Sequence, residues 1–323
     1  MARGSVLLVA ANGRRVERVA LAGERVLVEH DGSLVALVTV DGERLWDGHP
    51  QAFMSDAAFV VDPAGRRAVV YGGERLQVLD LGAGRVIAEA DSMSAIRCVD
   101  FDGERVVWTV RHTPFDWGEL DLWQVGGEKQ QLAGETGTSS AVAFHEAELV
   151  VADGATLCRY DLTGARLGQV DVDFSVERVI SLGTDGVLAA GHQVALVDPR
   201  TGAVRWAPPA VSTPQRFVVA RDGRRLVRLP GLVHTHAAQI AESFVVGSDA
   251  SRTVSAPPGV DWGDGAWLDA ERVALFCGRA IYRWDVGSGA CDRIAELGPD
   301  VTALDGAGAR IVAGCADGSV VLL

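Results

Sequence analysis

The stretch RIVAGCADGSVVLL (Arg310–Leu323) decides the fold, because it pairs two strands and leaves one of them without a neighbour. An apolar run is followed by a turn at Asp317 and Gly318 and then by a second apolar run, which is typical of a β-hairpin. The second run ends at Leu323 with no turn after it, so its outer edge needs cover, since proteins seldom leave such an edge open. We therefore expect another strand of the chain to pair with Ser319–Leu323.

The same hairpin pattern recurs along the whole chain. VALAGERV (Val19–Val26) and VDFDGERV (Val99–Val106) align without gaps, each as apolar alternation around a glycine turn. Weaker copies occupy Phe59–Val70, Val142–Val151, Val179–Ala190, Phe217–Val227, Trp267–Phe276 and Val301–Ala313. A period of about 40 residues is typical of repeat architectures, so the pattern predicts eight repeats.

The third strand of most repeats ends on an aspartate seven residues after a turn glycine, as from Gly278 to Asp285. Strand-ending positions recur every 37 to 44 residues, apart from one step of 87 that is about twice as long. The long step predicts a hidden repeat near Ala241. Applied to Gly318, the same rule places the last aspartate just beyond Leu323, so the final repeat lacks its fourth strand.

Three inner strands and an outer fourth strand, such as Glu43–Gly48 or Ala203–Pro208, make a four-stranded unit. Radial repetition of such units gives a β-propeller, which leaves no long edge exposed. We predict an all-β protein with eight blades, closed by pairing of the spare strand Ser5–Ala11 with Ser319–Leu323. Seven blades remain an alternative if the sixth repeat is a long excursion. The predicted blades span residues 16–49, 53–91, 95–133, 139–170, 176–208, 214–250, 260–297 and 300–323 with 5–11, all in one domain of residues 1–323.

Two repeats resemble known propeller families. Ala280–Leu297 resembles a Trp-Asp (WD) repeat, with Trp284 and Asp285 at the end of its third strand. Val194–Pro209 resembles a quinoprotein-type repeat, whose docking tryptophan corresponds to Trp206. The resemblance to WD-type domains implies an interaction platform, whereas the quinoprotein branch implies an enzyme with a cofactor or metal at the central channel.

Composition limits the partners and the compartment. A net charge of −13 argues against nucleic acid and anionic membranes as partners. No apolar run is long enough to span a membrane, and the run before Asn12 is short for a secretory signal, so we expect a cytoplasmic protein. The five cysteines are odd in number and form no CxxC pair, so we expect reduced thiols without disulfides. Lys129 is the only lysine among 30 basic residues, which we interpret as codon bias of a GC-rich bacterial genome.

Loops that link the second and third strands of a blade lie on one rim of this fold, here called the connector rim. Two of these loops are enlarged, Arg111–Gly118 and Leu229–His236, and the longest connector is Ser248–Gly265. Because loops carry function on rigid scaffolds, we predict partner-binding residues there. They are Arg111, His112, Phe115, Trp117, His234, His236 and Trp262. Six of the seven histidines fall on this rim, and only His145 belongs to the opposite, hairpin rim; we expect no metal and no cofactor.

Arginines near the start of the first strand form a second group of candidates. Arg97, Arg178 and Arg216 are predicted near the mouth of the central channel, where they could hold an acidic group of a partner. We therefore predict a non-catalytic scaffold that presents one rim and the channel mouth to a protein or peptide, as a subunit of a bacterial multiprotein complex. A propeller enzyme with a quinone or metal at the channel is the alternative.

Overall fold

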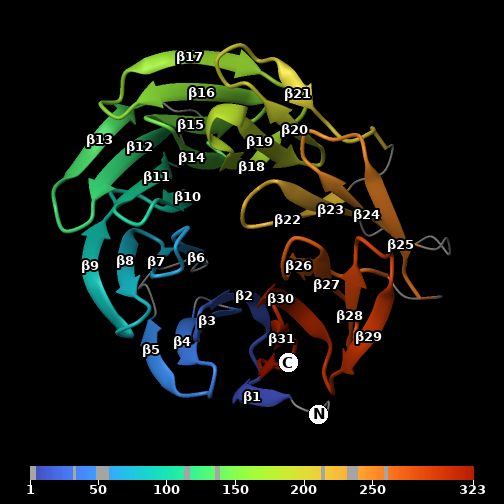
Figure 1. The fold of residues 1–323 in the computed structure, drawn as a ribbon. Helices are drawn as coiled ribbons and strands as arrows, with labels where there is room; N and C mark the ends of the chain where they lie inside the picture. The colour runs from blue at the N-terminus through green and yellow to red at the C-terminus, as the bar shows by residue number, and fades with distance from the viewer. Residues whose placement is uncertain are drawn as a thin grey trace. The chain divides into compact units, whose positions relative to one another are not determined.

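The computed structural model describes residues 5–31, 34–48, 58–112, 117–134, 139–211, 215–230, 239–257 and 261–323. These residues form eight four-stranded antiparallel sheets, which are the blades of a β-propeller (Figure 1). The prediction of an eight-bladed, all-β fold is confirmed. Helical structure in the described ranges is confined to one short turn, η1 (Gly183–Asp185). A helix long and apolar enough to cross a membrane is not found in them.

Contacts divide the chain into two compact units, each described here by itself. The first unit comprises Met1–His49, Val211–Val245 and Asp249–Leu323, and the second comprises Pro50–Ala210 with Val246–Ser248. We number the blades by the order of their first strands along the chain. The second unit holds blades 2 to 5, and the first unit holds blades 1, 7 and 8 with most of blade 6.

In the second unit each blade is four consecutive strands. Blade 2 is β6 (Ala58–Val61), β7 (Arg67–Gly72), β8 (Arg75–Asp80) and β9 (Arg85–Asp91); blade 3 is β10 (Ile96–Phe101), β11 (Arg105–His112), β12 (Trp117–Gln124) and β13 (Lys129–Gly134). Blade 4 is β14 (Ala141–His145), β15 (Glu148–Asp153), β16 (Thr156–Asp161) and β17 (Arg166–Asp171); blade 5 is β18 (Val176–Ser181), β19 (Val187–Gly191), β20 (Val194–Val197) and β21 (Val204–Trp206).

In the first unit blade 8 differs, because its strands come from both ends of the sequence. Blade 1 is β2 (Val16–Ala22), β3 (Arg25–His30), β4 (Leu34–Thr39) and β5 (Arg44–Gly48); blade 6 is β22 (Gln215–Val219), β23 (Arg225–Pro230), β24 (Ile240–Val245) and β25 (Ser251–Ser255). Blade 7 is β26 (Gly265–Trp267), β27 (Arg272–Cys277), β28 (Ala280–Asp285) and β29 (Cys291–Glu296); blade 8 is β30 (Val301–Ala307), β31 (Arg310–Cys315), β32 (Val320–Leu322) and β1 (Val6–Val9).

Strand β1 covers the edge that the C-terminal hairpin leaves open. It pairs antiparallel with β32, with Val6 opposite Leu322 and Leu7 opposite Val321, and Figure 1 shows it at the outside of blade 8. Leu8 is 5% exposed and packs into a core cluster that includes Val16 of blade 1. The predicted pairing of the terminal strands is therefore confirmed. The hidden sixth repeat is confirmed as well, because β24 is the third strand of blade 6.

The aspartate that ends the third strand closes the turn into the fourth. In blade 4 the Oδ1 atom of Asp161 accepts hydrogen bonds from the backbone N–H of Thr163 (2.8 Å) and of Ala165 (2.9 Å). The hydroxyl and backbone of Thr163 hold the pKa of Asp161 below its usual range. In blade 7 Asp285 accepts the N–H of Ser288 at 2.7 Å. The repeated aspartate therefore closes the turn into the fourth strand, and its distance from the preceding glycine corresponds to the third strand between them, Thr156–Asp161 in blade 4.

Trp206 on the outer strand of blade 5 contacts the turn between β24 and β25. Trp206 is buried, and its Nε1–H donates to the carbonyl oxygen of Ser248 at 2.9 Å. A buried indole normally finds such an acceptor, because an unpaired N–H in the interior is costly. The five cysteines are free thiols.

Candidate functional site

The enlarged loops of the predicted connector rim lie largely outside the described residues. Phe115, His234 and His236 fall in such segments. Arg111, His112 and Trp117 are placed by their strand backbone alone, at one end of the hairpin β11–β12, where His112 is opposite Trp117. The partner-binding role of these residues stays a prediction.

Trp262 is not the exposed anchor that its connector position predicts. Its side chain is 0% exposed, and its ring packs edge to face on Tyr282 with 5.6 Å between centroids. Its backbone N–H donates to Oε1 of Gln239 at 3.2 Å. The guanidinium of Arg216, another predicted site residue, donates to the carbonyl oxygen of Trp262 at 2.7 Å. Arg216 and Trp262 therefore contact each other and help to hold the fold, and the buried Trp262 side chain cannot contact a partner at the surface.

Arg97 and Arg178 lie on the first strands of blades 3 and 5, and both are exposed. Near Arg178 lies Asp100, whose Oδ2 atom accepts the backbone N–H of Phe144 in blade 4 at 2.8 Å. Burial raises the pKa of Asp100, while this hydrogen bond and the charge of Arg178 oppose the rise. The arrangement ties blade 3 to blade 4 and gives Arg178 an acidic neighbour within the protein.

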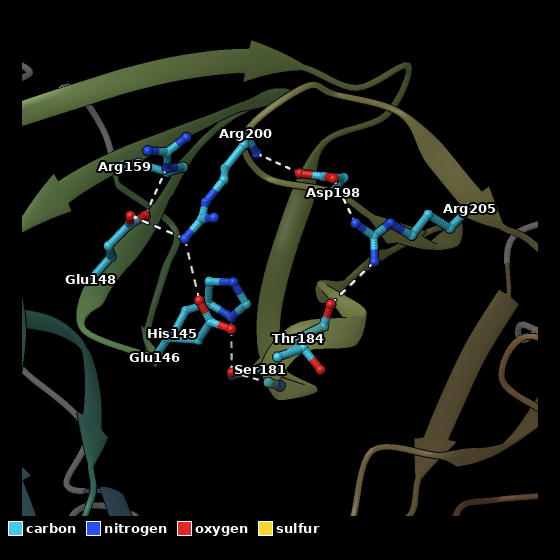
Figure 2. A network of polar contacts seen from close by, with 10 residues as sticks. His145, Glu146, Glu148, Arg159, Ser181, Thr184, Asp198, Arg200 and Arg205 are labelled. Atoms are coloured by element: carbon cyan, nitrogen blue, oxygen red, sulfur yellow. Dashed lines mark hydrogen bonds and ion pairs between the residues drawn. The ribbon is translucent and has the colours of Figure 1, made fainter.

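A denser set of polar contacts lies where blades 4 and 5 meet, around the first-hairpin turns of both blades and the turn between β20 and β21 (Figure 2). We call it the blade 4–5 cluster. Its members are His145, Glu146, Glu148, Arg159, Ser181, Thr184, Asp198, Arg200 and Arg205. It joins residues far apart in sequence through hydrogen bonds and ion pairs, so both blades fix its geometry.

Arg200 is the centre of the blade 4–5 cluster. Its guanidinium lies 3.2 Å from Glu146 and 3.5 Å from Glu148, and its backbone N–H donates to Asp198 at 2.9 Å. Glu148 is also held by Arg159 at 2.8 Å, in a pair that is mostly buried. The side chain of Arg200 is 56% exposed, so one face of its guanidinium remains open to solvent.

On the other side of Asp198, Arg205 completes the set. It lies 2.6 Å from the carboxylate of Asp198 and donates to the carbonyl oxygen of Asp185 at 2.9 Å. The backbone N–H of Arg200 and the side chain of Arg205 hold the pKa of Asp198 below its usual range. Asp198 is thus held by the guanidinium of Arg205 and by the backbone of Arg200, whose own guanidinium contacts Glu146 and Glu148.

Glu146 occupies an unusual backbone conformation. Within the part of the chain that the structure describes, it is the one non-glycine residue with positive φ, at 54°. The corresponding turn position is Gly23 in blade 1 (φ 61°) and Gly308 in blade 8 (φ 63°). An L-residue in the left-handed region costs about 1–2 kcal/mol. Glu146 therefore holds a strained position while its carboxylate contacts Arg200.

Next to Glu146, His145 is buried, and its Nδ1 atom lies 3.0 Å from Oγ of Ser181 in blade 5. Burial lowers the pKa of His145, against the opposing charges of Glu146 and Glu148. The imidazole is therefore neutral at pH 7 and links the two blades through the serine hydroxyl.

The predicted site residues do not include this cluster, although the sequence carries a signal for it. VAFHEAELVV has Glu146 where the two best repeats have glycine, and that substitution marks a turn with a special role. A grouping of three or more His, Cys, Asp or Glu side chains suited to a metal ion is not found among the described residues.

Comparison with known proteins identifies the fold and no family. No family model and no curated protein matches the chain. The computationally designed protein Ika8 superposes with a TM-score of 0.70 at 16% identity, over 97% of each chain. Sqt1 of Saccharomyces cerevisiae superposes with a TM-score of 0.72 at 11% identity, over 100% of this chain and 99% of that one. Such low identities show a shared fold alone, and membership in the WD-repeat group stays a prediction.

Proposed function

We propose that the protein is an interaction scaffold and that a partner protein docks on the blade 4–5 cluster. The observation that carries the proposal is the strained backbone of Glu146. Strained residues persist where the surrounding structure and a function maintain them. A glycine at this turn would avoid the strain, so a glutamate here points to a role for its carboxylate and for the arginine that it contacts.

The charges of the cluster suit docking. Arg200 and Arg205 are half exposed and held in place by carboxylates, so ordering them costs little entropy when a partner binds. Arginine is enriched among residues that dominate binding energy at protein interfaces. A carboxylate or a carbonyl oxygen on a partner segment fits the exposed part of either guanidinium group.

Affinity purification from native cells tests the proposal, with the tagged parent compared with Arg200→Ala and with Gly308→Ala as the control on blade 8. Adding a Cβ at Gly308 meets no heavy atom within 4 Å, so the control changes a similar turn without adding a clash. We expect a protein in stoichiometric amount with the parent and the control, and loss of that protein with Arg200→Ala. Absence of any stoichiometric protein in all three preparations would contradict a scaffold role. Equal retention by Arg200→Ala would instead contradict the docking surface.

A further inference from the structure

Blades 1 and 5 share more than the common blade plan. The first strands begin with the same four residues, VERV, at Val16–Val19 and Val176–Val179. Both strands carry a register shift directly after the initial residue, a feature that the first strands of blades 3 and 8 also have. Their third strands share VALV, and in both the leucine of that motif is opposite a tryptophan, Trp46 or Trp206.

Blades 3 and 7 share a different set of features. In blade 3 the Oδ1 atom of Asp102 accepts the backbone N–H of Arg105 at 2.7 Å, and Oδ2 accepts the Nε–H of the same arginine at 2.8 Å. In blade 7 Asp269 makes the same two contacts with Arg272, at 2.9 and 2.7 Å. Both third strands also place a tryptophan directly before the strand-ending position, opposite a valine of the second strand.

Blades 4 and 8 share a hydroxyl contact to the blade that follows. The Oγ–H of Ser140 is 2.5 Å from the carbonyl oxygen of Val176 in blade 5. The Oγ1–H of Thr302 is 2.6 Å from the carbonyl oxygen of Val16 in blade 1. Each hydroxyl also lies within reach of a carbonyl on its own second strand, at 3.4 and 3.2 Å. The two junctions are therefore built alike, atom for atom.

Blades 2 and 6 complete the series. Their first hairpins read FVVDPAGRR and FVVARDGRR, from Phe59 and Phe217. Val60 is opposite Val69, and Val218 is opposite Val227, so the two hairpins also have the same register. Every blade of the first half thus shares specific features with the blade four places later, in the same order.

We infer that the chain consists of two copies of one four-blade unit, blades 1–4 and blades 5–8. Ser140 and Thr302 make the same hydroxyl contact to the backbone of the blade that follows, so we expect blade 1 and blade 5 to be interchangeable neighbours for blades 4 and 8. The inference goes beyond the proposed scaffold function and does not rest on it. It also provides a position in blade 8 with which the blade 4–5 cluster can be compared. Gly308 of blade 8 is equivalent to Glu146, and Arg310 is equivalent to Glu148.

A blade exchange in the full chain tests the inference. In the in-phase variant, residues 176–208 are replaced by a copy of residues 16–48, and in the out-of-phase control they are replaced by a copy of residues 139–171. Both inserts have the same length as the segment they replace, so the chain stays at 323 residues. The in-phase variant keeps a valine at position 176 and a tryptophan at position 206, whereas the control puts serine and glutamine there.

We expect the in-phase variant to be monomeric and to melt cooperatively within about 5 °C of the parent, because its core contacts are retained. The control loses a buried valine and a docking tryptophan, so its melting temperature falls by more than about 10 °C or it fails to fold. The inference is overturned if the in-phase variant is no more stable than the control. It is also overturned if neither variant folds.

Single substitutions give a second measurement that does not depend on the exchange. Ser140→Thr and Thr302→Ser each install the residue of the other half, and we expect both to melt within about 2 °C of the parent. Ser140→Ala and Thr302→Val, which remove the hydroxyl, melt lower. The equivalence of the two junctions is refuted if Ser140→Thr is as damaging as Ser140→Ala.

Discussion

Truncating one leucine of β1 measures how much the terminal pairing stabilises the protein. Leu8 is 5% exposed in the core cluster of blades 1 and 8, whereas its neighbour Leu7 is 45% exposed on the other face of the same strand. Removal of a buried leucine side chain costs about 2–5 kcal/mol, because it forfeits transfer energy and leaves a cavity. A four-residue outer strand can relax, so we expect Leu8→Ala to cost about 2–3 kcal/mol and Leu7→Ala less than about 0.5 kcal/mol.

Urea denaturation followed by tryptophan fluorescence measures both variants against the parent. Deletion of residues 1–9 adds the loss of the β1–β32 ladder, whose bonds contribute about 0.5–1.5 kcal/mol each, for a total near 5 kcal/mol. The bared edge of β32 then favours dimers, which light scattering detects. Equal losses for Leu7→Ala and Leu8→Ala, or a deletion variant as stable as the parent and monomeric, refute the reasoning.

Three further predictions concern the cluster and the blade junctions. Glu146→Gly relieves a strained φ and should match or exceed the parent in melting temperature. Gly308→Ala puts a side chain at φ 63° and should lower the free energy of unfolding by about 1 kcal/mol. A marked loss of stability with Glu146→Gly would show that the turn is not strained. Burial lowers the pKa of His145 in the folded protein, so the unfolded chain binds a proton first as the pH falls. The free energy of unfolding should therefore fall as the pH drops through about 6.5. His145→Gln should flatten this slope between about pH 7.5 and 5.5, and an unchanged slope would contradict the assignment. Trp206→Phe loses the hydrogen bond to Ser248 and should cost about 1–2 kcal/mol by urea denaturation, whereas no change would mean that the contact adds nothing.

Repeat spacing is what made the fold predictable from the sequence. The aspartate that closes the turn after the third strand and the glycine before it act through local hydrogen bonds and backbone conformation. Local rules of this kind survive in most repeats even when other residues diverge, so a gap of twice the usual spacing located the sixth blade near Ala241. The open edge at Leu323 then required a partner strand, and the spare strand at Ser5–Ala11 was the available one.

The site depended on contacts that no local pattern encodes. Trp262 lies in a polar, glycine-rich connector, which favours exposure, yet its ring is buried against Tyr282 of blade 7. Burial of a loop tryptophan depends on the blade beside it and not on its sequence neighbours. His145 is the one histidine that the sequence places on the hairpin rim, but its partner Ser181 is 36 residues away in another blade. The one feature of the sequence that points to this cluster is Glu146, which replaces the glycine found at the same turn in other repeats.

The pairing of β1 with β32 also determines when blade 8 can be completed during synthesis of the chain. Val9 and Val320 are opposite each other although more than 300 residues separate them. A ribosome adds about 5–20 residues per second, so β1 waits roughly 15–60 s before its partner strand exists. During that interval the apolar segment VLLV (Val6–Val9) is an uncovered edge that neighbouring nascent chains can capture. Rapid synthesis or early chaperone binding at the first ten residues should therefore raise the yield of native protein more than changes in any inner blade.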